Sequence, residues 1–169
     1  MNYYYSGIGS RETPEHILNI MHHIGAYLAN QGWTLRSGAA SGADASFEEG
    51  ANHEDGATEI YLPWEGFNFS KSPLHPKTYP FSDEEKAFAA QYHPNWKKCS
   101  PSARLLHQRN TRQLIGLEAI HGEEVIVSKF VICWTEGGAL KGGTAQALRI
   151  ATAINIPIIN LGAAETAQE

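Results

Sequence analysis

The sequence predicts an α/β fold, a Rossmann-like three-layer sandwich with a mostly parallel sheet of about five strands. Short β-forming runs alternate with stretches of helical periodicity along most of the chain. Strands that alternate with helices are joined by right-handed crossovers, which make neighbouring strands parallel. Glycine-rich turns follow several of these runs, at the sheet edge where parallel α/β proteins bind ligands. The chain has 169 residues, and positions 1–169 are expected to form a single domain.

The order of strands and helices follows from this alternation. The strands are expected at 3–6, 33–36, 59–62, 130–134 and 157–161, and the helices at 14–31, 43–53, 102–117 and 144–154. The first helix begins at Thr13 and Pro14, a favoured capping pair, and ends at Gly32. The tail from Ala163 is expected to fray.

Residues 63–101 form a proline-rich insertion, because six of the eight prolines lie there. Such a density of proline disfavours regular elements. One short helix is expected after Ser82, which forms a Ser-x-x-Glu capping pattern with Glu85. The insertion either covers a ligand cleft or is a passive surface excursion.

Composition bounds the function classes. The formal net charge of −5 disfavours a dedicated duplex-DNA binder. The two cysteines, Cys99 and Cys133, form no CxxC pair and no metal-ligand spacing, so neither a disulfide framework nor a metal site is expected. The N-terminus lacks the pattern of a signal peptide, and no apolar run is long enough for a membrane span. A cytoplasmic location is therefore expected.

The first loop, residues 7–11, follows the first strand. Gly7 and Gly9 let a phosphate approach the backbone, and the next helix N-terminus adds N–H donors. Ser10 offers a hydroxyl donor, and Arg11 offers a guanidinium that pairs with phosphate or carboxylate. A tight turn with a surface arginine is the alternative.

The second loop, residues 37–44, joins the second strand to its helix. Asp44 lies in the first helical turn and is expected to bind a ribose hydroxyl, to hold Arg11 or simply to cap the helix. The small residues expected to form the backbone cradle of this loop are Ser37, Gly38 and Gly42.

The third loop, residues 135–144, carries the most specific phosphate-binding pattern, with four glycines in seven residues. It lacks the Gly-Lys-Ser/Thr of a Walker loop. Thr144 is expected to cap the next helix, and Glu136 could orient a ribose or act as a general base. Glu136 and Asp44 are the catalytic candidates, and a flexible turn is the alternative. The expected binding residues of this loop are Thr135, Glu136, Gly137, Gly138, Gly142, Gly143 and Thr144.

Residues 96–112 carry five basic side chains and no acidic one. This local charge could attract phosphates despite the negative total, with Trp96 or Trp64 stacking on bases. A solvated helix face is the alternative. Asn110 interrupts an apolar stripe on the helix and needs hydrogen-bond partners if it is buried. The basic residues are Lys97, Lys98, Arg104, Arg109 and Arg112, and the stripe comprises Ala103, Leu106, Leu114 and Leu117.

These motifs together resemble the DprA/Smf family of DNA-processing proteins, within the SLOG superfamily that joins DprA with the Lonely Guy phosphoribohydrolases. DprA relatives share a second loop of the type Ser-Gly-Gly-Ala-x-Gly-x-Asp and an Arg-Asn pair before the fourth strand. The matching residues are Ser37, Gly38, Ala40, Gly42 and Asp44, with Arg109 and Asn110 as the pair. The resemblance to DprA implies that the chain binds single-stranded DNA. The resemblance to Lonely Guy enzymes implies that it hydrolyses nucleoside monophosphates. Gln146 and Ala147 stand where the latter carry a catalytic glutamate.

Three functions are therefore considered. The favoured one is a DprA-like protein that binds the phosphate of a nucleotide or nucleic acid, because the glycine loops are intact and the glutamate is missing. The second is a hydrolase, either a nucleoside monophosphate N-glycosidase or an NAD-type nucleotide hydrolase. The third is a single-stranded DNA-binding recombination mediator. A nucleotide or nucleoside phosphate is the expected ligand, and assembly into a homo-oligomer is left open.

Overall fold

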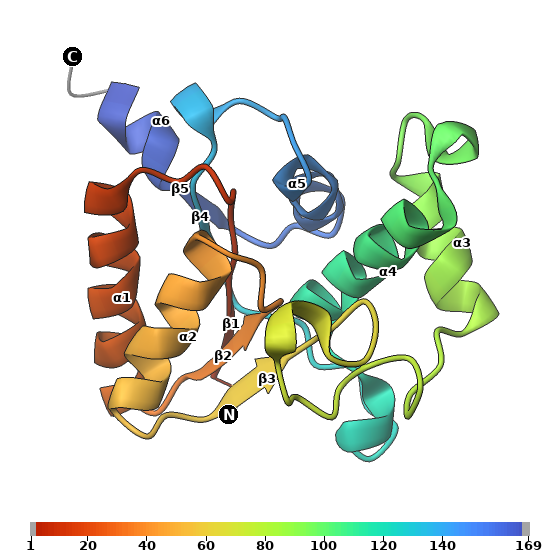
Figure 1. Ribbon diagram of the computed structural model, residues 1–169, viewed down its shortest axis with the longest axis horizontal. Helices are drawn as coiled ribbons and strands as arrows, with labels where there is room; N and C mark the ends of the chain where they lie inside the picture. The colour runs from red at the N-terminus through yellow and green to blue at the C-terminus, as the bar shows by residue number, and fades with distance from the viewer. Residues whose placement is uncertain (1–2, 167–169) are drawn as a thin grey trace.

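The fold is built on a sheet of parallel strands in the order β3-β2-β1-β4-β5, seen edge-on in Figure 1. The computed structural model describes residues 3–166. The strands are β1 (Tyr4–Gly7), β2 (Thr34–Ser37), β3 (Thr58–Ile60), β4 (Val131–Cys133) and β5 (Ile158–Asn160). Every neighbouring pair in this sheet is parallel. The predicted α/β class and the approximate strand count are confirmed, with strand ends that differ from the prediction by one or two residues.

Helices cover both faces of the sheet (Figure 1). α1 and α2 lie on one face, α4 and α5 lie on the other, and α3 packs against the outer side of α4. The helices are α1 (Glu15–Asn30), α2 (Ala43–His53), α3 (Asp83–Gln91), α4 (Pro101–Ile115), α5 (Thr144–Ala153) and α6 (Leu161–Thr166). Short 3-10 turns are η1 (Phe67–Phe69), η2 (Trp96–Lys98), η3 (Glu118–Ile120) and η4 (Glu136–Gly138). None of the helices within residues 3–166 has the length and apolarity that a membrane crossing requires.

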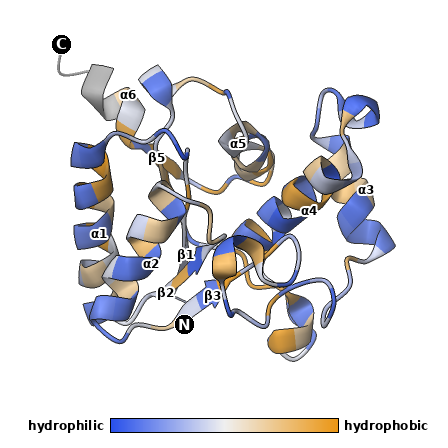
Figure 2. Ribbon diagram, in the orientation of Figure 1, coloured by the Kyte–Doolittle hydropathy of each residue, from blue (hydrophilic) through white to orange (hydrophobic). Residues whose placement is uncertain are grey.

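A hydrophobic core lies on each side of the sheet. Beneath α1 and α2 the core contains Tyr5, Met21 and Phe47, while much of the outer surface of α1 is polar (Figure 2). Beneath α4 and α5 it contains Leu114 and Cys133. Burial raises the pKa of the Cys133 thiol to about 12, so this cysteine is the inert buried thiol that its apolar surroundings predict.

The inner face of α4 differs from the prediction. The sequence predicts an apolar stripe, but Ala103 and Leu106 are only half-buried, and residues 108–113 are buried although all of them are polar. The physical reason is that this part of α4 packs against backbone carbonyls and a carboxylate rather than against apolar side chains. Arg109 donates to Gly38 O, for example, and Arg112 pairs with Glu85.

Three helix ends also require correction. α1 begins at Glu15 with Pro14, not Thr13, at the cap position, and no side chain caps it. Thr144 is the first residue of α5 rather than its cap, since Gly143 precedes the helix and no side chain caps it. The fraying expected from Ala163 is not found in residues 163–166, which belong to α6, and residues 167–169 lie outside the described part of the chain. The side chain of Asn160 accepts a hydrogen bond from Gly162 N at 3.0 Å, which stabilises the start of this last helix.

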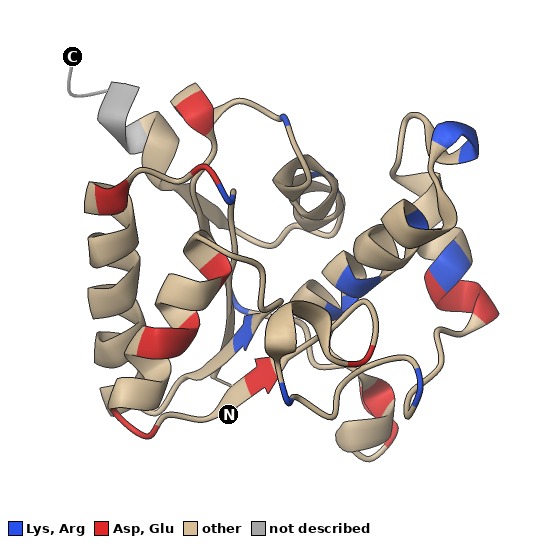
Figure 3. Ribbon diagram, viewed as in Figure 1, with Lys and Arg blue, Asp and Glu red and all other residues tan. Residues whose placement is uncertain are grey.

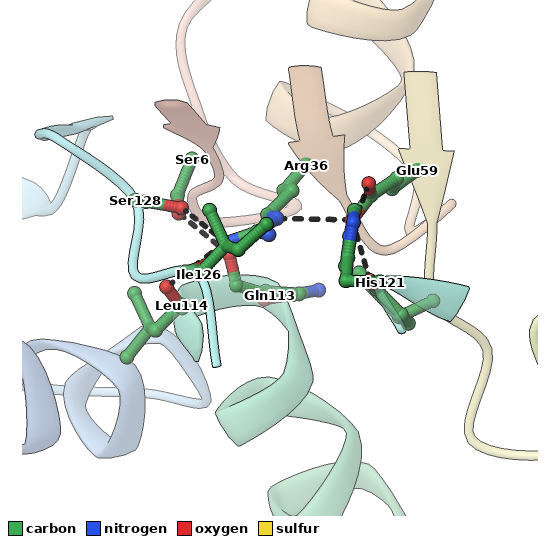
Figure 4. Close-up of polar contacts among 9 residues, drawn as sticks. Ser6, Arg36, Glu59, Gln113, Leu114, His121, Ile126 and Ser128 are labelled. Atoms are coloured by element: carbon green, nitrogen blue, oxygen red, sulfur yellow. Dashed lines mark hydrogen bonds and ion pairs between the residues drawn. The ribbon is translucent and has the colours of Figure 1, made fainter. Parts of the chain in front are cut away.

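A buried polar network fastens the segment between α4 and β4 to the sheet (Figure 4). Arg36, on β2, has no exposed surface, and its Nε lies 3.0 Å from Glu59 Oε1. Its Nη1 donates to the carbonyl oxygens of Leu114 and Ile126. The second carboxylate oxygen of Glu59 lies 2.8 Å from His121 Nε2. This network could not be predicted from the sequence, because an arginine in a short strand is usually a surface residue.

Candidate functional site

A cavity of about 830 Å³ opens at the carboxyl ends of β1 and β4. Strand order reverses direction between these two strands, and α/β proteins bind ligands at such a switch point. All three glycine-rich loops contribute to the wall, together with α4 and the proline-rich insertion. The predicted site residues that line the cavity are Gly9, Ser10, Arg11, Asp44, Arg109, Asn110, Thr135, Glu136, Gly142, Gly143 and Thr144.

Four of the remaining predicted site residues, Gly7, Ser37, Gly38 and Gly42, lie at close contacts between the loops and their neighbours. A Cβ on Gly7 would lie 2.6 Å from Phe47 Cγ, so this glycine permits the close approach of α2 to β1. Gly42 has a φ of +86°, and its Cβ would lie 2.9 Å from Arg11 Cα. Ser37 Oγ donates to Gly7 O at 2.6 Å. The residues outside the cavity wall are Gly7, Ser37, Gly38, Gly42, Gly137 and Gly138.

The carboxylate of Asp44 links the first and second loops through hydrogen bonds from their backbone amides. It is 4% exposed and accepts hydrogen bonds from the backbone amides of Ala40 and Gly9. Burial raises the pKa of Asp44 to about 6, although Arg109 and the two amides favour its charged form. The amides of Gly9 and Ala40, which the sequence predicted to bind a phosphate, therefore donate to Asp44 instead. The predicted contact between Asp44 and Arg11 is not formed.

Arg109 holds the second loop against α4. Its Nη1 donates to Gly38 O and, at 3.2 Å, to Tyr61 O, while its Nε donates to Asn110 Oδ1 at 3.1 Å. The guanidinium is buried, and burial lowers the pKa of Arg109 while Asp44 opposes that shift. Gly38 leaves room for this contact, because a Cβ there would lie 1.9 Å from the side-chain amide of Gln113 and 2.7 Å from Arg109 Nη1. Arg109 reaches the cavity wall but is already engaged in protein contacts.

The third loop remains open to a ligand. Asn110 Nδ2 donates to Gly143 O at 3.3 Å, which positions the loop over the end of α4. The amides of Gly143 and Thr144 begin α5 and have no acceptor within residues 3–166. They carry the positive end of the α5 dipole at the cavity wall. Within residues 3–166, this loop therefore offers backbone donors to the cavity that no protein acceptor occupies.

The side chains around the third loop differ in their availability. Lys141 Nζ lies 2.6 Å from Glu136 Oε2, and this hydrogen bond lowers the pKa of the exposed Glu136 carboxyl. The lowered pKa makes the Glu136 carboxylate a weaker proton acceptor, which disfavours it as a general base near neutral pH. Arg11 is exposed on the cavity wall and has no hydrogen bond or ion pair among the described side chains. Ser10 Oγ accepts from Glu12 N at 2.9 Å and keeps its own hydrogen for another acceptor.

The predicted basic strip at 96–112 does not form a continuous surface. Arg109 and Arg112 are buried, and Arg112 Nε lies 2.6 Å from Glu85 Oε2. Arg104 donates to Trp96 O at 3.0 Å, so Lys97 and Lys98 are the exposed cations of this segment. Figure 3 shows the basic residues along α4 and acidic residues on α2 and α3. Two of the basic side chains, Arg109 and Arg112, point into the protein, where carbonyl oxygens and a carboxylate accept their hydrogen bonds.

The proline-rich insertion forms one side of the cavity. It contains the predicted helix α3, with Ser82 and Glu85 in a reciprocal capping box. Phe67 and Asn68 line the cavity, and Asn68 Nδ2 donates to Ala39 O in the second loop at 3.1 Å. Of the two interpretations of this segment, the geometry favours a cover over a ligand cleft.

A group of potential metal ligands was missed by sequence reasoning. His93, Cys99 and His107 are half-buried, and their ligand atoms lie within 4.8 Å of one another. His93 and His107 also line the cavity. The signal was present as three such residues within 93–107, but a search for paired cysteines overlooks a set that combines one cysteine with two histidines.

Comparison with known proteins supports the fold. No protein-family model matches the sequence, and no curated protein is similar enough to match it. Two solved structures of the molybdenum cofactor carrier protein of Chlamydomonas reinhardtii resemble the chain, and each comparison covers 95% of this chain and 76% of the other. The first has 16% sequence identity and a TM-score of 0.56, and the second has 15% identity and a TM-score of 0.51. The chain thus shares a Rossmann-like α/β fold with these carrier proteins.

Proposed function

We propose that the protein binds a phosphate-bearing small molecule, a nucleotide or a cofactor of similar size, with a phosphate group at the start of α5. One observation carries this proposal. The amides of Gly143 and Thr144 and the guanidinium of Arg11, none of which has a partner among residues 3–166, line the same cavity. Backbone donors at a helix N-terminus together with an arginine are a recurrent anion site.

Cavity size and fold support the same conclusion. A volume of about 830 Å³ lies in the range of small-molecule and cofactor sites. The neighbours in fold are, by name, carriers of a molybdenum cofactor, which favours a small molecule as the cargo of this chain as well. A single-stranded DNA role of the DprA type has weaker support, because Arg109 and Arg112 are withdrawn from the surface.

A matched pair of substitutions at Gly143 tests the phosphate position. Gly143 has φ −64°, an angle that proline adopts, so Gly143→Pro removes the N–H without requiring a new φ at this residue, and circular dichroism checks that the variant is folded. Gly143→Ala keeps the N–H, and its Cβ meets nothing within 4 Å. Loss of one charge-assisted hydrogen bond predicts about tenfold weaker binding for the proline variant and little change for alanine.

The measurement is calorimetry with nucleoside mono-, di- and triphosphates, NAD and oligo-dT, preceded by mass spectrometry of any co-purified ligand. Binding of a phosphorylated small molecule that weakens in Gly143→Pro supports the proposal. Equal binding by both variants would place the phosphate elsewhere. Binding of oligo-dT alone, with steep salt dependence, would favour the recombination mediator, and a folded protein that binds none of these ligands would refute the proposal.

Hydrolysis of the bound nucleotide is a second candidate, and Asp44 is the observation that favours it. Asp44 lines the cavity and has a pKa of about 6, close to the pH at which a general acid or base works best. Release of free base from a monophosphate panel, measured by chromatography, should then disappear in Asp44→Asn. Release that persists in this variant, or that never exceeds background, would exclude Asp44 as the catalytic group.

A further inference from the structure

We propose that His93, Cys99 and His107 bind a transition-metal ion of the zinc class, with three protein ligands and a fourth position accessible from the cavity. The inference is independent of the phosphate site proposed above. It rests on three side chains that take no part in the proposed phosphate site. Their chemistry is one thiol and two imidazoles, the ligand types that zinc prefers and that magnesium and calcium avoid.

The distances suit tetrahedral coordination. Zinc bonds of about 2.0–2.1 Å to nitrogen and about 2.3 Å to sulfur put adjacent nitrogen and sulfur ligands about 3.6 Å apart. Cys99 Sγ lies 3.8 Å from His93 Nδ1, and the rings of His93 and His107 have centroids 4.4 Å apart. All three ligand atoms lie within 4.8 Å of one another, so one ion could be shared among them after the side chains rotate.

Local structure holds the three ligands in place. Cys99 lies between η2 and α4, where Ser100 caps α4 by accepting from Ala103 N at 3.1 Å. His107 projects from α4 itself, so its backbone is fixed by the helix. Trp96 lies against both histidine rings, with centroid distances of 6.0 Å to His93 and 6.2 Å to His107. An indole beside the ligands restricts water on one side, as the apolar surroundings of metal sites do.

The state of the ring nitrogens bears on the proposal. The amide of Asn95 donates to His93 Nδ1 at 3.0 Å and occupies its lone pair, so a metal bound at Nδ1 would replace this hydrogen bond. The Nδ1 atom of His107 is buried and has no hydrogen-bond partner within the described residues. A buried nitrogen without a partner is costly, and each such group calls for an explanation. A bound cation that draws the His107 ring onto itself would supply one.

The position of the site suggests what it does to the cavity. His93 and His107 belong to the wall, together with Arg109 and the start of α5. Cys99 would bind as a thiolate and release its proton to solvent, leaving one net positive charge on the metal and its thiolate. The cavity would then have cationic groups on two sides, and the fourth coordination position would hold a water molecule or an anionic group of the ligand.

Cobalt substitution tests the site directly. The full-length protein is dialysed against Zn²⁺ or Co²⁺, and bound metal is measured by atomic spectroscopy and by absorption. One metal per chain is expected, and the Co²⁺ form should show a thiolate-to-cobalt charge-transfer band with intense tetrahedral d–d bands. Cys99→Ser should abolish the charge-transfer band, and both Cys99→Ser and His107→Gln should weaken Zn²⁺ binding at least about tenfold.

A surface histidine group provides the matched control. His22 lies beside His23 and His53, with ring centroids 5.9 Å and 6.1 Å apart, and such a group can retain metal without a built site. The double variant His22→Gln/His53→Gln should leave stoichiometry and spectrum unchanged. Circular dichroism of each metal-free variant checks folding, and His93→Gln replaces Cys99→Ser if the latter is unfolded. Absence of binding, a cobalt spectrum without thiolate, or metal lost only in the surface variant would overturn the proposal.

Discussion

Arg109 donates a hydrogen bond from Nη1 to the carbonyl oxygen of Gly38, and this bond ties the second loop to α4. The same nitrogen reaches Tyr61 O, at the end of β3. One guanidinium therefore satisfies two buried carbonyl groups and lies close enough to Asp44 to favour its charge. Arg109, which the sequence predicted to bind a phosphate, is therefore engaged in contacts that stabilise the fold.

Replacing Arg109 with methionine should destabilise the protein by about 3 kcal/mol, because it leaves two buried carbonyls and the Asp44 carboxylate without their partner. Urea unfolding followed by circular dichroism measures the change. Lys98→Met is the control, since Lys98 is exposed and its replacement should change stability by less than about 0.5 kcal/mol. Similar losses in the two variants would show that Arg109 is not needed to hold the loop.

Asp44 should make stability fall as pH rises through the weakly acidic range. Its folded pKa of about 6 lies above the ordinary 3.8, so the folded state binds a proton that the unfolded state has released. Relative to Asp44→Asn, the wild-type protein should gain about 1 kcal/mol between about pH 7 and about pH 5. Urea unfolding of both proteins at the two pH values tests this. A difference that does not depend on pH would contradict a raised pKa.

Glu85 should have the opposite pH dependence. Burial raises the pKa of Glu85, but hydrogen bonds from Arg112 and Ser82 outweigh burial and leave it lowered. Its stabilising contribution is therefore complete above its ordinary pKa of 4.5 and is lost as pH falls through the lower folded value. Glu85→Gln should cost about 2 kcal/mol at neutral pH, because Arg112 remains buried without its carboxylate.

The thermal midpoint of Glu85→Gln should accordingly fall less steeply than that of the wild type below pH 4.5. Glu84→Gln, at the exposed neighbouring position on α3, serves as the control and should retain the wild-type acid profile. Parallel acid profiles for all three proteins would show that the Glu85 pair contributes no pH-dependent stability.

The buried network of Figure 4 predicts a large effect of Arg36→Met. The substitution leaves Glu59 in a buried position without its guanidinium and should cost about 3 kcal/mol. The exposed pair Lys77–Glu65, with Nζ and Oε2 3.1 Å apart, is the comparison, and Lys77→Met should change the free energy of unfolding far less than Arg36→Met. Chemical denaturation measures both, and equal costs would argue against a structural role for the network.

Two glycines of the loops should differ in their tolerance of alanine. Gly42 and Gly142 both have positive φ, but a Cβ at Gly42 would also lie 2.9 Å from Arg11 Cα, whereas a Cβ at Gly142 meets nothing within 4 Å. Gly142→Ala should cost about 1 kcal/mol from backbone strain alone, and Gly42→Ala distinctly more. Unfolding experiments rank the two variants, and the reverse order would show that the first and second loops are not in contact as described.

Much of the fold could be predicted from local patterns. Helical periodicity and an N-terminal glycine predicted α2 at 43–53, and the Ser-x-x-Glu pattern predicted α3 within a proline-rich segment. Because parallel strands end at the same sheet edge, the sequence also predicted that the first and third loops would meet. These inferences depend only on neighbours in the chain and on general rules of connection.

Whether a backbone amide or arginine is free to bind a phosphate depends on contacts between segments that are distant in the sequence. The amides of Gly9 and Ala40 were equivalent candidates to those of Gly143 and Thr144, yet Asp44 occupies the first pair. Whether Arg109 faces solvent or Gly38 depends on how α4 approaches the second loop.

By itself, the sequence determined the alternation of strands and helices, the edge of the sheet that carries the glycine loops, and the residue types available there. Tertiary structure alone decided which donors remain free, which arginines are buried and which three side chains surround a potential metal position between 93 and 107. The physical reason is that periodicity and capping act within a few residues. The partner of a buried polar group, in contrast, is whichever carbonyl or carboxylate the packing of remote segments brings within about 3 Å.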